Sequence, residues 1–175
     1  MEEETINRYW QDNKIFEESL IQNSDKNTYV YFDGPPFMSG LPHYGHLLAG
    51  YIKDSVLRYN YANGMNVPRI AGVDAHGLPI EYEIEKELGI KMKQEIENMG
   101  IMNYNNECRK IIFKYLDEWK RQTLRIGRWI DYDNRYATID KNFMNSVWWV
   151  FKKLYEDNKI YCGVEVMGYP YRRRR

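Results

Sequence analysis

The 175-residue sequence has only two cysteines, three histidines and no long hydrophobic run. Cys108 and Cys162 show no CxxC spacing and cannot form a disulfide framework, which fits a reducing compartment. No stretch approaches the roughly 18 apolar residues that span a bilayer. The acidic start, MEEETINRYW, lacks the apolar core of a signal peptide. These absences predict a cytoplasmic protein with no membrane partner.

An excess of one charge is also absent, because 25 Lys and Arg residues balance 25 Asp and Glu residues. No global charge field therefore indicates a nucleic-acid or membrane partner. The apolar fraction of 43% and the five tryptophans are typical of a folded globular chain. The length fits one domain, or part of one.

Hydrophobic periodicity and β-branched residues predict alternating strands and helices. We expect strands over 28–33, 67–73 and 160–167, and helices over 3–22, 44–63, 79–98 with a break at Gly89, 105–128, and onward from a cap at Asp140. The first strand, the glycine-rich loop, the 44–63 helix and the second strand make a βαβ unit. The two strands should therefore be parallel neighbours. The predicted fold class is α/β, with a buried parallel sheet.

Two of the later helices carry apolar stripes that should face the core. The first stripe consists of Ile112, Leu116, Trp119 and Ile126, and the second of Phe143, Val147, Val150, Phe151 and Leu154.

Two of the three histidines stand at the start of the 44–63 helix. His43 and His46 are three residues apart, so they can lie on the same side of the first turn. A helix N-terminus that follows a strand binds anions, because its free N–H groups and its dipole point at the ligand. Gly45 would let a phosphate or a flat ring approach the backbone. From these residues alone, a phosphate site and two ordinary surface or capping histidines both remain open.

Four segments follow one another in the order of a known family: DGPPFMSGLPHYGHLLAG (33–50), GVDAHGLPIEYEIEKELGIK (72–91), the stretch 108–140, and SVWWVFKKLYEDNKIYCGVEVM (146–167). Over about residues 9–167 the chain resembles the N-terminal part of isoleucyl-tRNA synthetases, with HYGH as the class I signature. The resemblance implies the first half of a Rossmann-like, HUP-type catalytic domain at 28–171. It would follow an N-terminal helical extension at 1–27 and precede a basic tail at 172–175.

The resemblance also implies the site and the reaction. His43 and His46 would be the catalytic pair that contacts the ATP phosphates, and Gly45 would lie against the adenine. The main chain of Pro35 would contact the ammonium group of isoleucine, and Asp74 would pair with that charge. The implied reaction is formation of isoleucyl-adenylate from isoleucine and ATP, with Mg²⁺ accompanying ATP, followed by transfer to tRNA(Ile). No tightly bound metal is expected in this segment.

Other parts of the family have no counterpart in these residues: the editing domain, the KMSKS loop and the anticodon-binding domain. The isolated chain is therefore expected to be inactive, or to need a partner chain that supplies the missing half. KMKQE at 91–95 is interpreted as a solvated helix face and not as KMSKS. Val73 and Ala75 differ from the residues that flank the matching aspartate, here Asp74, in many relatives. This difference would change the packing of the amino-acid pocket.

Two other functions would use some of the same residues. The chain could be a non-catalytic remnant that binds ATP, an adenylate or a partner protein. It could instead be a metal-dependent hydrolase in which His76 joins His43, His46 and Asp74. Weak ATP binding without pyrophosphate exchange would favour the first function, and stoichiometric bound zinc would favour the second.

Overall fold

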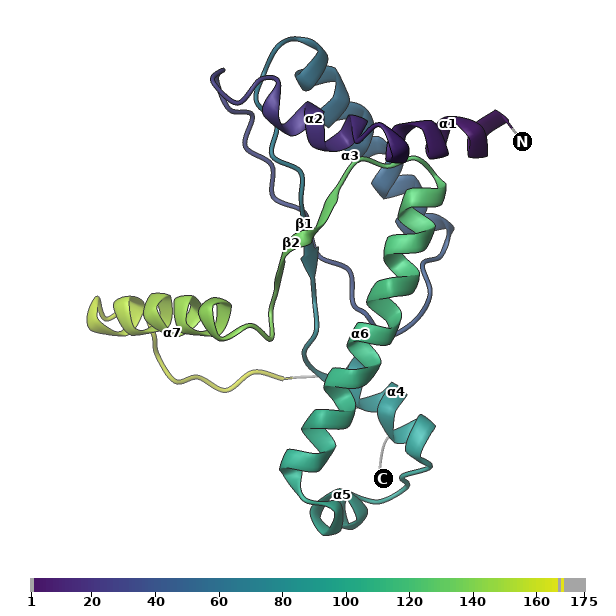
Figure 1. Cartoon of the computed structure of the whole chain (residues 1–175). Helices are drawn as coiled ribbons and strands as arrows, with labels where there is room; N and C mark the ends of the chain where they lie inside the picture. Colours follow the sequence, from purple (N-terminus) through teal and green to yellow (C-terminus); the bar gives the residue numbers. More distant parts are fainter. Residues whose placement is uncertain (1, 167, 169–175) are drawn as a thin grey trace.

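The computed structural model describes residues 2–166 and residue 168, and it arranges helices around a short parallel sheet (Figure 1). The elements in chain order are α1 (Glu2–Asp12), α2 (Ile15–Ile21), α3 (Tyr44–Ala62), β1 (Ile70–Val73), α4 (Leu78–Leu88), α5 (Lys93–Met99), α6 (Ile101–Arg125), β2 (Asp131–Ala137) and α7 (Lys141–Glu156). Helices α1 to α3 gather at one end of α6 and α4 and α5 at the other, while α7 extends away from the sheet (Figure 1). The predicted α/β class is confirmed. Within the described residues, no helix is long and apolar enough to cross a membrane.

The sheet pairs β1 with β2, in parallel, with Gly72 opposite Tyr136 and Val73 opposite Ala137. The regular strand expected over 28–33, and with it a continuous ladder to 67–73, is not formed. The sequence of β2, DYDNRYA, alternates poorly and carries three charged residues, so its local pattern does not predict a strand. Residues 131–137 form a strand because they pair with the buried strand β1.

Residues 28–37 run beside β1 in the parallel direction but form no regular strand. Isolated bridges join Thr28 to Asn66 and Phe37 to Asp74. Between these two bridges the chain from Thr28 to Phe37 is one residue longer than the chain from Asn66 to Asp74. In addition, Pro35 and Pro36 have no N–H to donate to a strand ladder. The predicted strand fails for these two reasons.

The helix predictions are confirmed where a glycine marks the end of the helix. Helix α3 matches the expected 44–63 helix, and α4 and α5 divide near Gly89, whose φ of 70° ends α4. The single helix expected over 3–22 is instead two helices, because Lys14 adopts a left-handed conformation between them. Residues 160–166 form no strand, and residue 167 and the expected basic tail at 172–175 lie outside the described residues.

The core forms where α4, α5 and α6 pack against the sheet. The buried apolar cluster includes Met38, Ala71, Val73, Ile80, Ile84, Ile112, Leu116, Trp119 and Ile130. Three members of the expected α6 stripe are thus buried, but Ile126 follows the end of the helix and is 42% exposed.

Helix α7 differs from its prediction. No residue of α7 is buried, and Val147 and Phe151 are about half exposed, at 52% and 48%. The described contact that ties the helix to the sheet is a stack of Phe143 on Tyr136, with ring centroids 5.9 Å apart. The apolar stripe that should have faced the core is therefore open.

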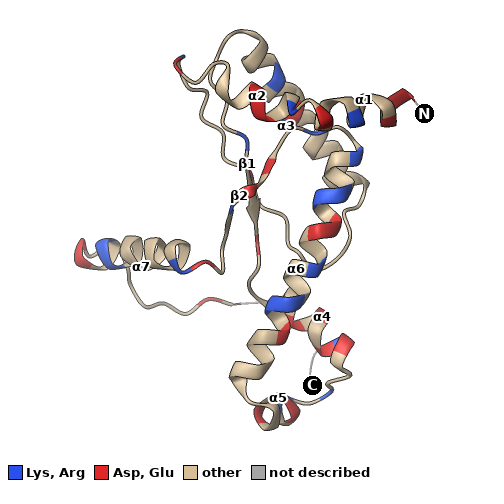
Figure 2. Ribbon diagram, viewed as in Figure 1, with Lys and Arg blue, Asp and Glu red and all other residues tan. Residues whose placement is uncertain are grey.

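Cation–π contacts of Arg58, near the C-terminal end of α3, connect this helix to Trp10 of α1 and to Trp129. The guanidinium of Arg58 lies 4.0 Å from the ring centroid of Trp129 and 5.2 Å from that of Trp10. Arg69, only 1% exposed, donates to the Ser19 hydroxyl at 3.0 Å. Charges elsewhere are mixed: Figure 2 shows Lys and Arg interleaved with Asp and Glu along α6.

Candidate active site

The HYGH segment forms the first turn of α3. His43 is the N-cap residue, and its Nδ1 accepts a hydrogen bond from the Gly45 N–H at 3.1 Å. The His46 Nδ1 accepts in return from the His43 N–H at 3.2 Å. The two imidazoles stack, with centroids 3.6 Å apart. The prediction that both histidines lie on the same side of the first turn is confirmed.

These bonds determine which nitrogen of each ring carries hydrogen. A main-chain N–H can only donate, so each Nδ1 must be unprotonated, and each neutral ring carries its hydrogen on Nε2. Burial lowers the pKa of His46 from its usual value, and the charge of His43 lowers it further. Two Nε2–H donors at a helix N-terminus suit an anionic ligand.

Gly45 has a local reason to lack a side chain. A Cβ at this position would lie 3.0 Å from Cε1 of His43, which is closer than ordinary packing allows. Because Gly45 has no Cβ, the His43 ring can pack against the backbone of the first turn. This reason is independent of any contact between Gly45 and a nucleotide.

The backbone places the double-proline loop beside Asp74. The Asp74 N–H donates to the Pro36 carbonyl at 3.1 Å, and the Met38 N–H donates to the Asp74 carbonyl at 3.2 Å. Asp74 directly follows β1, at the carboxyl end of the strand, where open α/β sheets bind ligands. The Asp74 side chain is half-buried. Pro35 and Asp74, predicted to share a site, therefore belong to adjacent backbone segments.

A buried carboxylate organises the start of this loop. Asp33, 6% exposed, pairs with Lys53 of α3 at 2.6 Å and with Arg128 at 3.2 Å. It also accepts from the Tyr31 hydroxyl at 2.7 Å. Burial, reinforced by Asp33, raises the pKa of Tyr31. Two cations thus compensate the buried charge of Asp33 at the start of the loop.

Two aromatic residues with structural roles at the site were not predicted as site residues. The Trp119 indole N–H donates to the Gly40 carbonyl at 2.7 Å, and the Tyr136 hydroxyl donates to the Asp33 carbonyl at 2.7 Å. Both residues lie about 80 to 100 positions from their acceptors. No local spacing links such distant residues, so the sequence offered no signal for these contacts.

The third histidine does not join the first two in a metal site. Among the described residues, no group of three or more His, Cys, Asp or Glu side chains could hold a metal ion. His76 is exposed at the start of the α4 region, next to a pocket that also includes Ala75 and Glu81. The arrangement does not favour the metal-dependent hydrolase.

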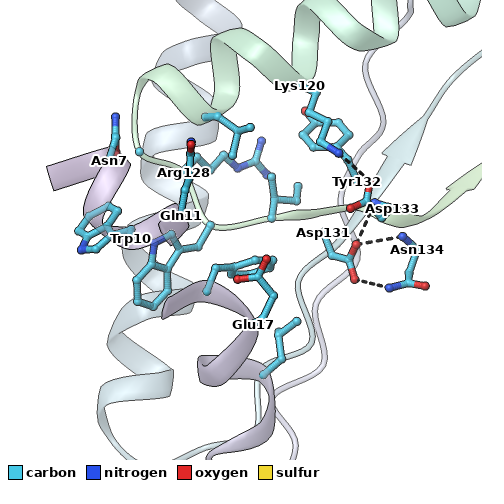
Figure 3. Close-up of a pocket in the computed structure, with 16 residues that line it drawn as sticks. Asn7, Trp10, Gln11, Glu17, Lys120, Arg128, Asp131, Tyr132, Asp133 and Asn134 are labelled. Carbon is cyan, nitrogen blue, oxygen red and sulfur yellow. Dashed lines mark hydrogen bonds and ion pairs between the residues drawn. The ribbon is translucent and has the colours of Figure 1, made fainter. Parts of the chain in front are cut away.

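A separate cavity of about 370 Å³ lies between the N-terminal helices and the start of β2 (Figure 3). Trp10 and Glu17 line one side, and Asp131 and Lys120 lie across from them. None of the expected site residues lines this cavity.

Comparison with known proteins defines the class of protein to which this α/β fold belongs. The family model described as tRNA synthetases class I (I, L, M and V) matches residues 5–174, so the chain belongs to this family. Within it, the chain is 51% identical over 168 residues to the mouse protein named isoleucine–tRNA ligase, cytoplasmic. It is 50% identical over 167 residues to isoleucine–tRNA ligase of Chlamydia pneumoniae.

The coverage of these matches is unequal. The alignments include 96% and 95% of this chain but only 13% and 16% of the mouse and Chlamydia proteins. A solved structure, LeuRS of Agrobacterium radiobacter in a ternary complex with tRNA and LeuAMS, superposes with a TM-score of 0.65 at 21% identity. This superposition covers 89% of this chain and 17% of the LeuRS chain, and it supports the assignment of the fold.

Proposed function

We propose that this chain forms the first half of the nucleotide-binding domain of an isoleucine–tRNA ligase, at residues 28–171. Residues 1–27 are its helical extension and 172–175 a basic tail. The full-length enzyme activates isoleucine with ATP and transfers it to tRNA(Ile) in the cytoplasm, and the isolated chain is inactive. The observation that carries the proposal is the first turn of α3, where the stacked His43 and His46 each leave an Nε2–H free to donate.

At the phosphate end, His43 and His46 donate to the ATP phosphates, assisted by the dipole of α3. Charge builds on the α-phosphate and on the leaving pyrophosphate as the isoleucine carboxylate attacks. Donors already held in place by the capping bonds stabilise that charge without reorganisation. Gly45 leaves room for the adenine, and Mg²⁺ enters with ATP as part of the substrate. The chain's own contribution is positioning and charge stabilisation, so no protein nucleophile is needed.

At the amino-acid end, the Asp74 carboxylate pairs with the ammonium group of isoleucine, and the Pro35 carbonyl accepts a hydrogen bond from it. The hydrogen bonds between the proline loop and Asp74 support this arrangement, because they hold the main chain next to Pro35 beside Asp74 at the end of β1. His43 and Asp74 would then face one cleft.

The test is pyrophosphate exchange by a full-length ligase carrying these residues. His43→Ala or His46→Ala should raise the barrier to adenylate formation by about 2–4 kcal/mol, the cost of losing a transition-state donor. The affinity for isoleucine should change far less. His76→Ala is the matched control and should leave exchange unchanged. Unaltered exchange in both His43 and His46 variants would refute the phosphate role.

A further inference from the structure

The segment that leads into α3 has few anchors of its own. Main-chain hydrogen bonds tie Met38 to Asp74, and the next main-chain bonds belong to the first turn of α3 at His43. Between these points, residues 39–43 contain a bend and no regular structure. Unless something holds this segment, the N-cap histidine can shift relative to the sheet.

The Trp119 side chain supplies an anchor from a distant helix. It is 6% exposed within the core cluster, and its N–H donates to the Gly40 carbonyl at 2.7 Å. An indole N–H can only donate, and a buried donor without an acceptor costs free energy, so this bond restricts both partners.

The same indole also contacts the signature directly. The His46 ring packs against the Trp119 ring in a T-shaped arrangement, with centroids 4.8 Å apart. The His46 ring also stacks on the His43 ring, with centroids 3.6 Å apart. One buried side chain thus contacts both the loop before the helix and the second histidine within it, and His46 has two aromatic partners.

We propose that Trp119 is a positioning residue, which holds the Gly40 segment and the His46 imidazole in the geometry that the ATP phosphates require. This inference rests on the proposed function of His46. Trp119 acts through its contacts with Gly40 and His46. A small displacement of a catalytic donor costs up to about 100-fold in rate, so the effect of losing this anchor is measurable.

Two substitutions separate its contacts in the full-length ligase. Trp119→Phe removes the N–H donor and keeps an aromatic ring against His46, and we expect it to raise the KM for ATP about fivefold, the equivalent of one hydrogen bond. Trp119→Leu removes both contacts and should lower the exchange rate about 100-fold. The KM for isoleucine should stay within about twofold in Trp119→Phe. Trp129→Phe, the same change at a tryptophan that contacts Arg58, is the matched control and should leave the KM for ATP unchanged.

A double-mutant cycle then distinguishes positioning from a general loss of structure. If Trp119 acts through His46, adding Trp119→Leu, which removes the ring contact with His46, to a His46→Ala enzyme should cost much less than adding it to the wild type. Equal costs in both backgrounds, or equal rises in the KM for ATP and isoleucine, would overturn the positioning role. Failure of the proposed function gives a different result, in which His46→Ala alone retains full exchange.

Discussion

The Tyr136 hydroxyl donates to the main-chain carbonyl of Asp33 at 2.7 Å, although 103 residues separate them in the chain. Tyr136 belongs to β2 and pairs with Gly72 of β1. A Cβ on Gly72 would lie 2.5 Å from the ring and the hydroxyl of Tyr136, so the phenol lies across the glycine. The Tyr136 side chain of β2 thus reaches across β1 to the 28–37 segment. Its hydrogen bond to Asp33 holds this segment beside β1, where no regular strand ladder forms.

Gly72→Ala should therefore destabilise the domain by about 1–3 kcal/mol, the usual cost of overpacking. Thermal or urea unfolding of the full-length ligase measures this change. Tyr136→Phe, which keeps the ring and removes only the hydroxyl, should cost about 1 kcal/mol. An alanine variant with wild-type stability would show that the ring does not lie over Gly72.

Asp74→Asn should weaken the binding of isoleucine more than tenfold in the full-length ligase. The amide keeps the shape of the side chain but removes the charge that pairs with the ammonium group, and charge-assisted hydrogen bonds are about twice as strong as neutral ones. ATP affinity should be nearly unchanged, and isothermal titration with each ligand measures both. Asp133→Asn, at an exposed carboxylate paired with Lys120, serves as the control. Equal losses for the two ligands would indicate a structural aspartate instead.

Protonation of His46 should destabilise the first turn of α3. Burial and the charge of His43 lower its pKa in the folded state, so the unfolded state binds the proton more tightly. The contribution of His46 to stability is then fully present above about pH 6.5, the unfolded value, and is lost as the pH falls through the lowered folded value. A protonated Nδ1 also cannot accept from the His43 N–H. An NMR titration of the imidazole should give a midpoint below 6.5, and a midpoint at or above that value would contradict the prediction.

The 175-residue chain expressed alone should self-associate and should not charge tRNA. Apolar side chains of helix α7 that are 40–68% exposed include Val147, Trp148, Val150, Phe151 and Leu154. Contiguous apolar surface of this kind promotes association. Light scattering should show oligomers, and Val150→Lys with Phe151→Glu should reduce them. A monodisperse monomer that charges tRNA with isoleucine would overturn both the association and the need for the missing half.

Local chemistry was sufficient for the features that depend on neighbours in the chain. The extent of α3 followed from its pattern and from Gly64, whose φ of 81° lies just beyond the helix. The break near Gly89 followed from the same freedom of glycine. The position of His43 and His46 on one side of the first turn followed from helical spacing, because residues three apart lie on one face. The resemblance of these short motifs to the synthetase family was also readable without coordinates.

The pairing of β2 with β1 and the exposure of α7 were decided by the tertiary structure. β2 is a strand because the buried β1 presents an open edge to it, while residues 28–33 had the better strand composition but lead into two prolines and an extra residue. The apolar stripe of α7 predicts a buried face, yet burial needs a partner surface, and Tyr136, which stacks on Phe143, leaves Val147, Val150 and Phe151 about half exposed. The anchors at Gly40 and Asp33 join residues far apart in sequence, and such contacts exist only after the chain has folded.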